Sequence, residues 1–225
     1  MARTTARPPA PKWPWIVGGV VVVALIIAAV FVFTRSSGND QPVSSPAATS
    51  TGAPDGAEAP TGCLGGDKRD AAMVLAAQKA APDTSAGAVE FAAAMQRFLY
   101  QYPYPTADDA VAATNAVMAK DAETRDLAAF FATNPNISGG LVPDGQSYYR
   151  STIPGVWHLE SYSNNQAVVS IGTGVVIDGK LNTTIRGSIT VTVVWEDGAW
   201  KFLTSSGTRT TEELYSVGTP FTAGC

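Results

Sequence analysis

The chain has 225 residues, of which 45% are hydrophobic and 15% are charged, and its formal net charge is −4 at pH 7. This acidic balance argues against a general nucleic-acid binder, which needs clustered lysine and arginine. One histidine and two cysteines far apart in the chain exclude a zinc finger, a site with two histidine ligands and a CxxC redox centre.

The first predicted element is a transmembrane helix. Residues 15–33 carry no charge, and as a helix they would span about 28 Å, close to the thickness of the hydrocarbon layer. Arg3, Arg7 and Lys12 precede this segment, so the charge bias places residues 1–14 in the cytoplasm and everything after the helix outside the cell. A cleaved signal peptide is the alternative, but its apolar core is usually shorter and a small-residue cleavage site follows it.

The next predicted segment, residues 34–62, is a disordered linker. It is rich in Ser, Thr, Ala, Gly and Pro, and Val43 is its only large aliphatic residue. Such a composition buries too little apolar area to offset the entropy of the chain. Residues 63–225 then form one extracytoplasmic domain, which is long enough to build a core.

The first half of this domain is predicted to be helical. Apolar residues recur at three- and four-residue steps from Thr84 to Tyr102, and the prolines Pro103 and Pro105 end that helix. Further helices are expected from Asp70 to Ala80, from Thr106, where Asp109 completes a capping box, and over residues 121–133.

The second half is predicted to be an antiparallel sheet. Asn164-Asn165, Asp178-Gly179 and Asp197-Gly198 favour hairpin turns between strands. The expected strands are 147–153, 156–163, 166–177, 181–196 and 199–205. Gly172 and Gly174 predict a bulge that curves the sheet. Helices followed by such a meander predict an α+β fold with helices packed on a curved antiparallel sheet.

Cys63 and Cys225 are the candidate disulfide. An extracytoplasmic domain lies in an oxidising space, where two cysteines favour a bond that would clip the end of the chain to the start of the domain. The alternatives are two free thiols that never meet and a bond between two chains.

His158 is the candidate residue for acid–base chemistry. On an alternating strand it shares a face with Val156, Glu160 and Tyr162, and a histidine beside a carboxylate is either an acid–base pair or a cross-strand partner. We favour the second interpretation. The sequence carries no nucleotide-binding or hydrolase motif, so we predict no catalytic residue, no cofactor-binding residue, no metal ligand and no enzymatic activity.

Two other groups of residues have a structural and a functional interpretation. The acidic pairs Asp108-Asp109 and Glu212-Glu213 are predicted in the first turns of helices, where they complement the helix dipole. Five tyrosines could line a binding surface, although such residues more often belong to a core or its rim. They are Tyr100, Tyr102, Tyr104, Tyr148 and Tyr149.

Two stretches, 138–162 and 205–225, together with the sequence GCLGG at 62–66, resemble an uncharacterised family of actinobacterial single-pass membrane proteins. Members of that family travel with integrative or conjugative elements. The resemblance covers residues 62–225 and implies no active site. In its architecture the predicted domain is similar to the NTF2-like cone of type IV secretion assembly factors and Mce-associated membrane proteins, although one fold hosts many functions.

These features predict a non-enzymatic interaction or assembly module, anchored in the cell membrane by one helix. Its partners are expected to be the bilayer and other envelope proteins, in a conjugation or secretion apparatus, and not nucleic acid. The alternative is a small-ligand-binding NTF2-like module or an Mce-associated type of accessory protein, with an apolar molecule in the cone. An enzyme would need two titratable side chains that converge in that cavity. The oligomeric state stays open.

Overall fold

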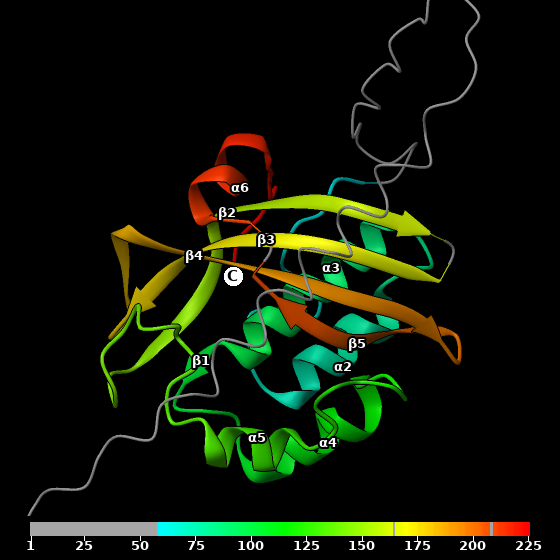
Figure 1. The fold of residues 1–225 in the computed structure, drawn as a ribbon, viewed down its shortest axis with the longest axis horizontal. Helices are drawn as coiled ribbons and strands as arrows, with labels where there is room; N and C mark the ends of the chain where they lie inside the picture. The colour runs from blue at the N-terminus through cyan, green and yellow to red at the C-terminus, as the bar shows by residue number, and fades with distance from the viewer. Residues whose placement is uncertain (1–57, 164, 208) are drawn as a thin grey trace, which may run out of the picture. The chain divides into compact units, whose positions relative to one another are not determined.

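The computed structural model describes residues 58–163, 165–207 and 209–225 (Figure 1). The predicted cytoplasmic tail, the transmembrane helix at 15–33 and the linker up to residue 57 lie outside the described residues. In the described part of the chain no helix is both long enough and apolar enough to cross a membrane.

The last residues of the predicted linker belong to the folded domain. Pro60 and Gly62 are buried. The carbonyl oxygen of Pro60 accepts a hydrogen bond from the backbone of Thr222 at 3.1 Å, and that of Thr61 accepts one from Ala223 at 3.2 Å. The ordered domain therefore begins before Cys63, the boundary expected from composition.

The first half of the described chain contains four helices: α2 (Ala71–Ala80), α3 (Ser85–Leu99), α4 (Ala107–Val117) and α5 (Leu127–Thr133). Each begins after a polar residue whose side chain accepts a backbone N–H of the first turn, which satisfies a donor that the helix leaves unpaired. These N-caps are Asp70, Thr84, Thr106 and Asp126. Three of the four helix starts follow the predicted positions, whereas α5 begins later than residue 121.

Four long antiparallel strands follow: β2 (Tyr148–Ser163), β3 (Gln166–Ile177), β4 (Lys180–Glu196) and β5 (Ala199–Ser206). The strands lie in the order β1-β2-β3-β4-β5, and the short strands β1 (Gln101–Tyr102) and β6 (Thr219–Pro220) both pair with β2. Asp178 and Asp197 have positive φ values of 48° and 53°, as do the glycines that follow them, which is the backbone of a type I′ hairpin turn. The predicted α+β fold with a curved antiparallel sheet is confirmed.

The sheet bends at the predicted glycines. β2 is one strand, not two, and its register with β3 shifts between Ser151 and Val156, opposite Gly174 and Gly172. Added Cβ atoms would come within 3.0 Å of neighbouring side chains at both glycines, so the missing side chains leave room for close packing there.

The hydrophobic core lies between α3 and the sheet. Phe91, Met95 and Phe98 of α3 are fully buried in the same cluster as Ile171 and Trp200. A short helix, α6 (Thr211–Val217), packs on the other face of the sheet. Neighbouring residues of a strand point to opposite faces. Thr173 accepts a hydrogen bond from Gln96 of α3, whereas a Cβ at the adjacent Gly172 would lie 3.3 Å from Leu214 of α6. Figure 1 shows α6 beside β2, at the opposite end of the domain from α4 and α5.

Candidate functional site

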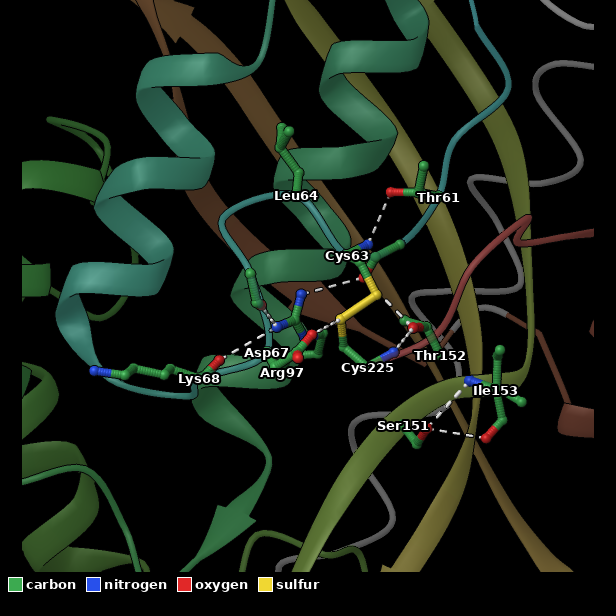
Figure 2. Close-up of a disulfide and its surroundings, with 12 residues drawn as sticks. Thr61, Cys63, Leu64, Asp67, Lys68, Arg97, Ser151, Thr152, Ile153 and Cys225 are labelled. Atoms are coloured by element: carbon green, nitrogen blue, oxygen red, sulfur yellow. Dashed lines mark hydrogen bonds between the residues drawn. A yellow bond between two sulfur atoms is a disulfide. The ribbon is translucent and has the colours of Figure 1, made fainter.

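The two cysteines form a disulfide that joins the start of the domain to the end of the chain (Figure 2). Their Cα atoms lie 5.6 Å apart. Thr152 of β2 holds the tail, because its N–H donates to the Cys225 carbonyl at 3.2 Å and its hydroxyl accepts from the Cys225 N–H at 3.1 Å. The structure therefore contains the cysteine pair expected from the sequence, fixed against the sheet.

Two charged side chains of α3 hold the segment before the disulfide. The Glu90 carboxylate accepts hydrogen bonds from the Thr61 hydroxyl at 2.7 Å and from the Gly62 N–H at 3.1 Å. Arg97, fully buried seven residues later on the same helix face, donates to the carbonyl oxygens of Gly62 and Lys68, each at 3.2 Å. Burial lowers the pKa of Arg97 to about 10, so its guanidinium stays charged at neutral pH.

Asp67 approaches the disulfide. One carboxylate oxygen of Asp67 lies 3.2 Å from the Cys225 sulfur, and suitable atoms of Cys63, Asp67 and Cys225 all lie within 4.8 Å of one another. A soft metal would bind cysteine as a thiolate, but these sulfurs are bonded to each other. In this oxidised form the cluster is a structural disulfide that joins the start of the domain to its C-terminal end.

The candidate acid–base pair lies on the α6 face of the sheet. His158 is opposite Ser170 on β3, and its Nε2 atom lies 3.8 Å from a Glu160 carboxylate oxygen. Glu160 accepts hydrogen bonds from the Ser170 hydroxyl at 2.6 Å and from Arg209, whose Nη2 lies at 2.8 Å and whose Nε also donates. The His158 and Glu160 side chains are 18% and 21% exposed, so they lie half-buried on the sheet.

These contacts keep Glu160 ionised. The hydrogen bonds from Arg209 lower the pKa of the Glu160 carboxyl, and those from Ser170 add to the effect. A nucleophilic triad needs the histidine between the acid and the hydroxyl, whereas here the carboxylate lies between His158 and Ser170. The arrangement suits a structural ion pair that fastens the segment before α6 to the sheet.

The structure corrects the predicted face of Tyr162. The register of β2 shifts between Leu159 and Ser161, so Tyr162 pairs with the buried Ala167. Its ring lies 6.4 Å from that of Trp200, a core residue. Val156 and Glu160 do share the face of His158, and the bulge at Glu160 moves Tyr162 to the other side.

Both acidic pairs lie in first turns of helices, as predicted. Thr106 caps α4 and donates its hydroxyl hydrogen to Asp109 at 2.7 Å, and this bond lowers the pKa of Asp109. Thr210 caps α6 in a reciprocal capping box with Glu213, whose pKa is lowered by the Thr210 backbone N–H. Asp109 also accepts the N–H of Ala71 at 3.1 Å, so it links the start of α4 to the start of α2.

An apolar cleft opens between the end of α3, α5 and the edge strand β5. Its free volume is about 70 Å³. Leu99, Tyr100, Leu127, Phe130, Ile137, Phe202 and Leu203 form its apolar wall, and Glu123, Thr124, Thr204 and Ser205 form its polar side. The Thr204 hydroxyl donates to Glu123 at 2.7 Å across this side. A cleft with an apolar floor and a few polar groups at its edge is typical of a binding site.

Of the five tyrosines considered for a binding surface, Tyr100 lines this cleft. Tyr104 stacks on Phe131 at 4.9 Å between ring centroids, and Tyr102 meets Tyr104 edge-on at 5.7 Å. Tyr148 is buried, and Tyr149 lies under the guanidinium of Arg69 at 3.8 Å. Four of the five are therefore packing residues.

The family comparison covers most of the folded domain. A family model described as a domain of unknown function, DUF8175, matches residues 82–221. The chain belongs to the DUF8175 family. The match extends from the residues before α3 to the segment after β6, so this DUF8175 domain includes the cleft, while α2 and both cysteines lie outside the matched region. No curated protein and no solved structure matches the chain.

Proposed function

We propose that this DUF8175 protein is a membrane-anchored, non-enzymatic interaction module whose extracytoplasmic domain binds another envelope protein through the cleft between α3, α5 and β5. The transmembrane helix at 15–33, the NTF2-like relationship and the setting in a conjugation or secretion apparatus are parts of this proposal. The observation that carries this proposal is the cleft. Its walls come from the end of α3, the loop before α5, α5 itself and the edge of β5, and the His158–Glu160 pair is not among its lining residues.

The volume of the cleft supports a protein partner over a small-molecule ligand. Pockets for small molecules usually measure about 300–1,000 Å³, and an engineered cavity that binds benzene measures about 150 Å³. The free volume here is about 70 Å³, which suits one aliphatic side chain of a docked protein. A few residues that fill well-packed, desolvated pockets carry most of the binding energy in protein interfaces.

Site-specific photocrosslinking in the native host tests this proposal. A photoreactive amino acid at Thr124, which lines the cleft, is expected to form an adduct with a second envelope protein, and Leu203→Glu is expected to abolish that adduct. The matched control is the same amino acid at Lys180, the exposed first residue of β4. Adducts of equal yield from both positions, or none from Thr124, would contradict the proposal.

The membrane topology has its own test. In intact cells freed of their wall, an added protease is expected to cut within residues 34–57 and release the domain, while a cytosolic marker stays intact. Protection of the domain until the cells are lysed would place it inside the cell and remove the envelope function.

A further inference from the structure

We infer that the partner contributes an extended segment that adds to the free part of strand β5, with one aliphatic side chain in the cleft and a basic residue beside it. This inference rests on the proposed function and names the kind of partner. It joins three independent features: an unpaired strand edge, a cleft sized for one side chain, and an acidic loop next to both.

The edge of β5 is covered along its first half and open along its second. On the side away from β4, the carbonyl oxygen of Trp200 accepts from the Gln78 side chain at 2.8 Å, and that of Phe202 accepts from the Ala119 N–H at 2.8 Å. Beyond Phe202, β5 pairs with β4 alone in the described part of the chain. Residues Leu203–Ser206 therefore form an open edge, to which a further strand can add.

The alternation of the ladder shows which backbone groups are available. The N–H of Trp195 donates to Asn165, toward β3, so Val191, four residues earlier on β4, also directs its backbone toward β3. Ser205 is the β5 partner of Val191 and accordingly directs its N–H and C=O away from β4. Ser205 is exposed, and its backbone has no hydrogen-bond partner among the described residues.

The cleft lies directly beside this edge, because Leu203, Thr204 and Ser205 line it. Side chains of an added strand alternate between the two faces of the sheet, so one residue of the segment projects toward Leu127 and Phe130. The small volume of about 70 Å³ and the apolar wall favour one aliphatic side chain over a longer apolar segment.

The charge beside the cleft favours a basic neighbour to this anchor. The loop over residues 121–126 carries Asp121, Glu123 and Asp126 against the single cation Arg125. Glu123 lines the cleft, where its carboxylate accepts a hydrogen bond from the Thr204 hydroxyl at 2.7 Å. A lysine or arginine next to the anchor would face this carboxylate, on a loop of net negative charge.

A second copy of the chain fits the site less well than a different protein. Apart from Leu203, which is partly buried in the wall of the cleft, the open edge of β5 offers serine and threonine. The exposed large apolar residues lie on other elements: Val111, Ile153, Tyr162, Leu181 and Val217. The β5 edge of one copy thus has no exposed aliphatic side chain for the cleft of another. A four-residue edge is also short for a stable dimer, whose interface buries about 1,200 Å² or more in total.

Selection of peptides against the full-length protein in nanodiscs tests the inference. The probe is a displayed library of random heptapeptides, counter-selected on Leu203→Glu protein whose thermal unfolding shows that it folds. Enriched peptides are expected to share one aliphatic residue next to a lysine or arginine, and to bind wild-type protein at least tenfold more tightly than Leu203→Glu. Val111→Glu, at an exposed site on α4, is the matched control and should leave binding unchanged.

Methylation of the peptide backbone separates strand addition from simple insertion of a side chain. An N-methyl group on the amide that pairs with the Ser205 carbonyl should weaken binding at least tenfold, since it removes a main-chain hydrogen bond. Equal binding of the methylated and parent peptides would overturn strand addition. Strand addition by a partner would also be overturned if no peptide were selected, or if the protein formed a dimer that Leu203→Glu abolishes. In either case, a protein adduct from Thr124 would still support the proposed function.

Discussion

At the scale of single residues, Glu160 gives a pH-dependent prediction. Its pKa is lowered in the folded state, chiefly by Arg209, so its contribution to stability is present above the ordinary pKa of 4.5 and is lost as the pH falls through the folded value. Glu160→Gln should lower the free energy of unfolding by about 1–2 kcal/mol at pH 7, and the difference should vanish in acid.

Chemical denaturation of both proteins between pH 7 and pH 2 measures this difference. Glu212→Gln is the control, because Glu212 is exposed on α6 and forms no salt bridge among the described residues. A cost of Glu160→Gln that stayed constant across the pH range would show that the charge of Glu160 is not its source.

Gly187 provides a second prediction at this scale. A Cβ at Gly187 would lie 1.3 Å from Nη1 of Arg150, whose guanidinium is buried, with only 4% of the residue exposed, and donates to the Ser138 carbonyl at 3.3 Å. Gly187→Ala should therefore cost about 1–3 kcal/mol of stability through overpacking. Gly207→Ala is the control and should cost less than about 0.5 kcal/mol, because nothing lies within 4 Å of its Cβ position. Equal unfolding midpoints for the two variants would refute the close packing of Arg150 against Gly187.

Residue-scale predictions from sequence succeeded where the chemistry is local. Thr106 caps α4 as predicted, because a hydroxyl followed three residues later by an acid has one favourable local geometry, and Thr210 caps α6 in the same way. Tyr162 was placed on the wrong face because the bulge at Glu160 adds one residue to β2, and the alternating pattern contains no sign of it.

At the scale of elements, Leu214 is the one side chain of α6 in the buried class. Leu214 is fully buried against the α6 face of the sheet, while Val217 on the same helix is 51% exposed. Leu214→Ala should cost about 2–4 kcal/mol, whereas Val217→Ala should be nearly neutral. Thermal unfolding of the two variants checks this, and similar losses would show that α6 does not pack as described.

The elements themselves were largely predictable. Apolar periodicity locates α3, and the Asp-Gly dipeptides locate the hairpins, because both signals act over a few residues. The merging of two predicted strands into β2 was not predictable, since it depends on pairing with β3 across the bend at Gly172 and Gly174. The helix around α5 was predicted to begin too early, at residue 121, because the prediction rested on apolar residues alone. Asp126 is the N-cap, so the helix begins at Leu127.

At the scale of the whole molecule, the disulfide joins the two ends of the domain. It links residues 162 positions apart, so it removes much of the freedom of the unfolded chain. Replacement of both cysteines by serine should lower stability by about 2–5 kcal/mol. Unfolding of the wild type and of the double-serine variant with and without a reducing agent measures this loss. The reductant should destabilise the wild type alone. A wild type whose stability did not change on complete reduction would contradict the stabilising role of the disulfide.

The cleft could not be predicted from the sequence, because its walls come from segments far apart in the chain. Leu127 and Phe130 were visible as the apolar side of a helix, and Tyr100 as a possible rim residue. Nothing in the sequence places Leu203 beside them, since that contact depends on how β5 ends the sheet. The disulfide was easier to foresee, because the chain has two cysteines and therefore one possible internal pair.

The most direct test of the central claim compares backbone amide exchange in two states of the full-length protein. One is purified into nanodiscs alone, and the other is held in native membrane vesicles with its partners. Binding at the cleft predicts slower exchange in residues 203–206 and 124–130, with the rest of the domain unchanged. Unchanged exchange in both segments, or protection centred on α6 and the disulfide, would contradict the account.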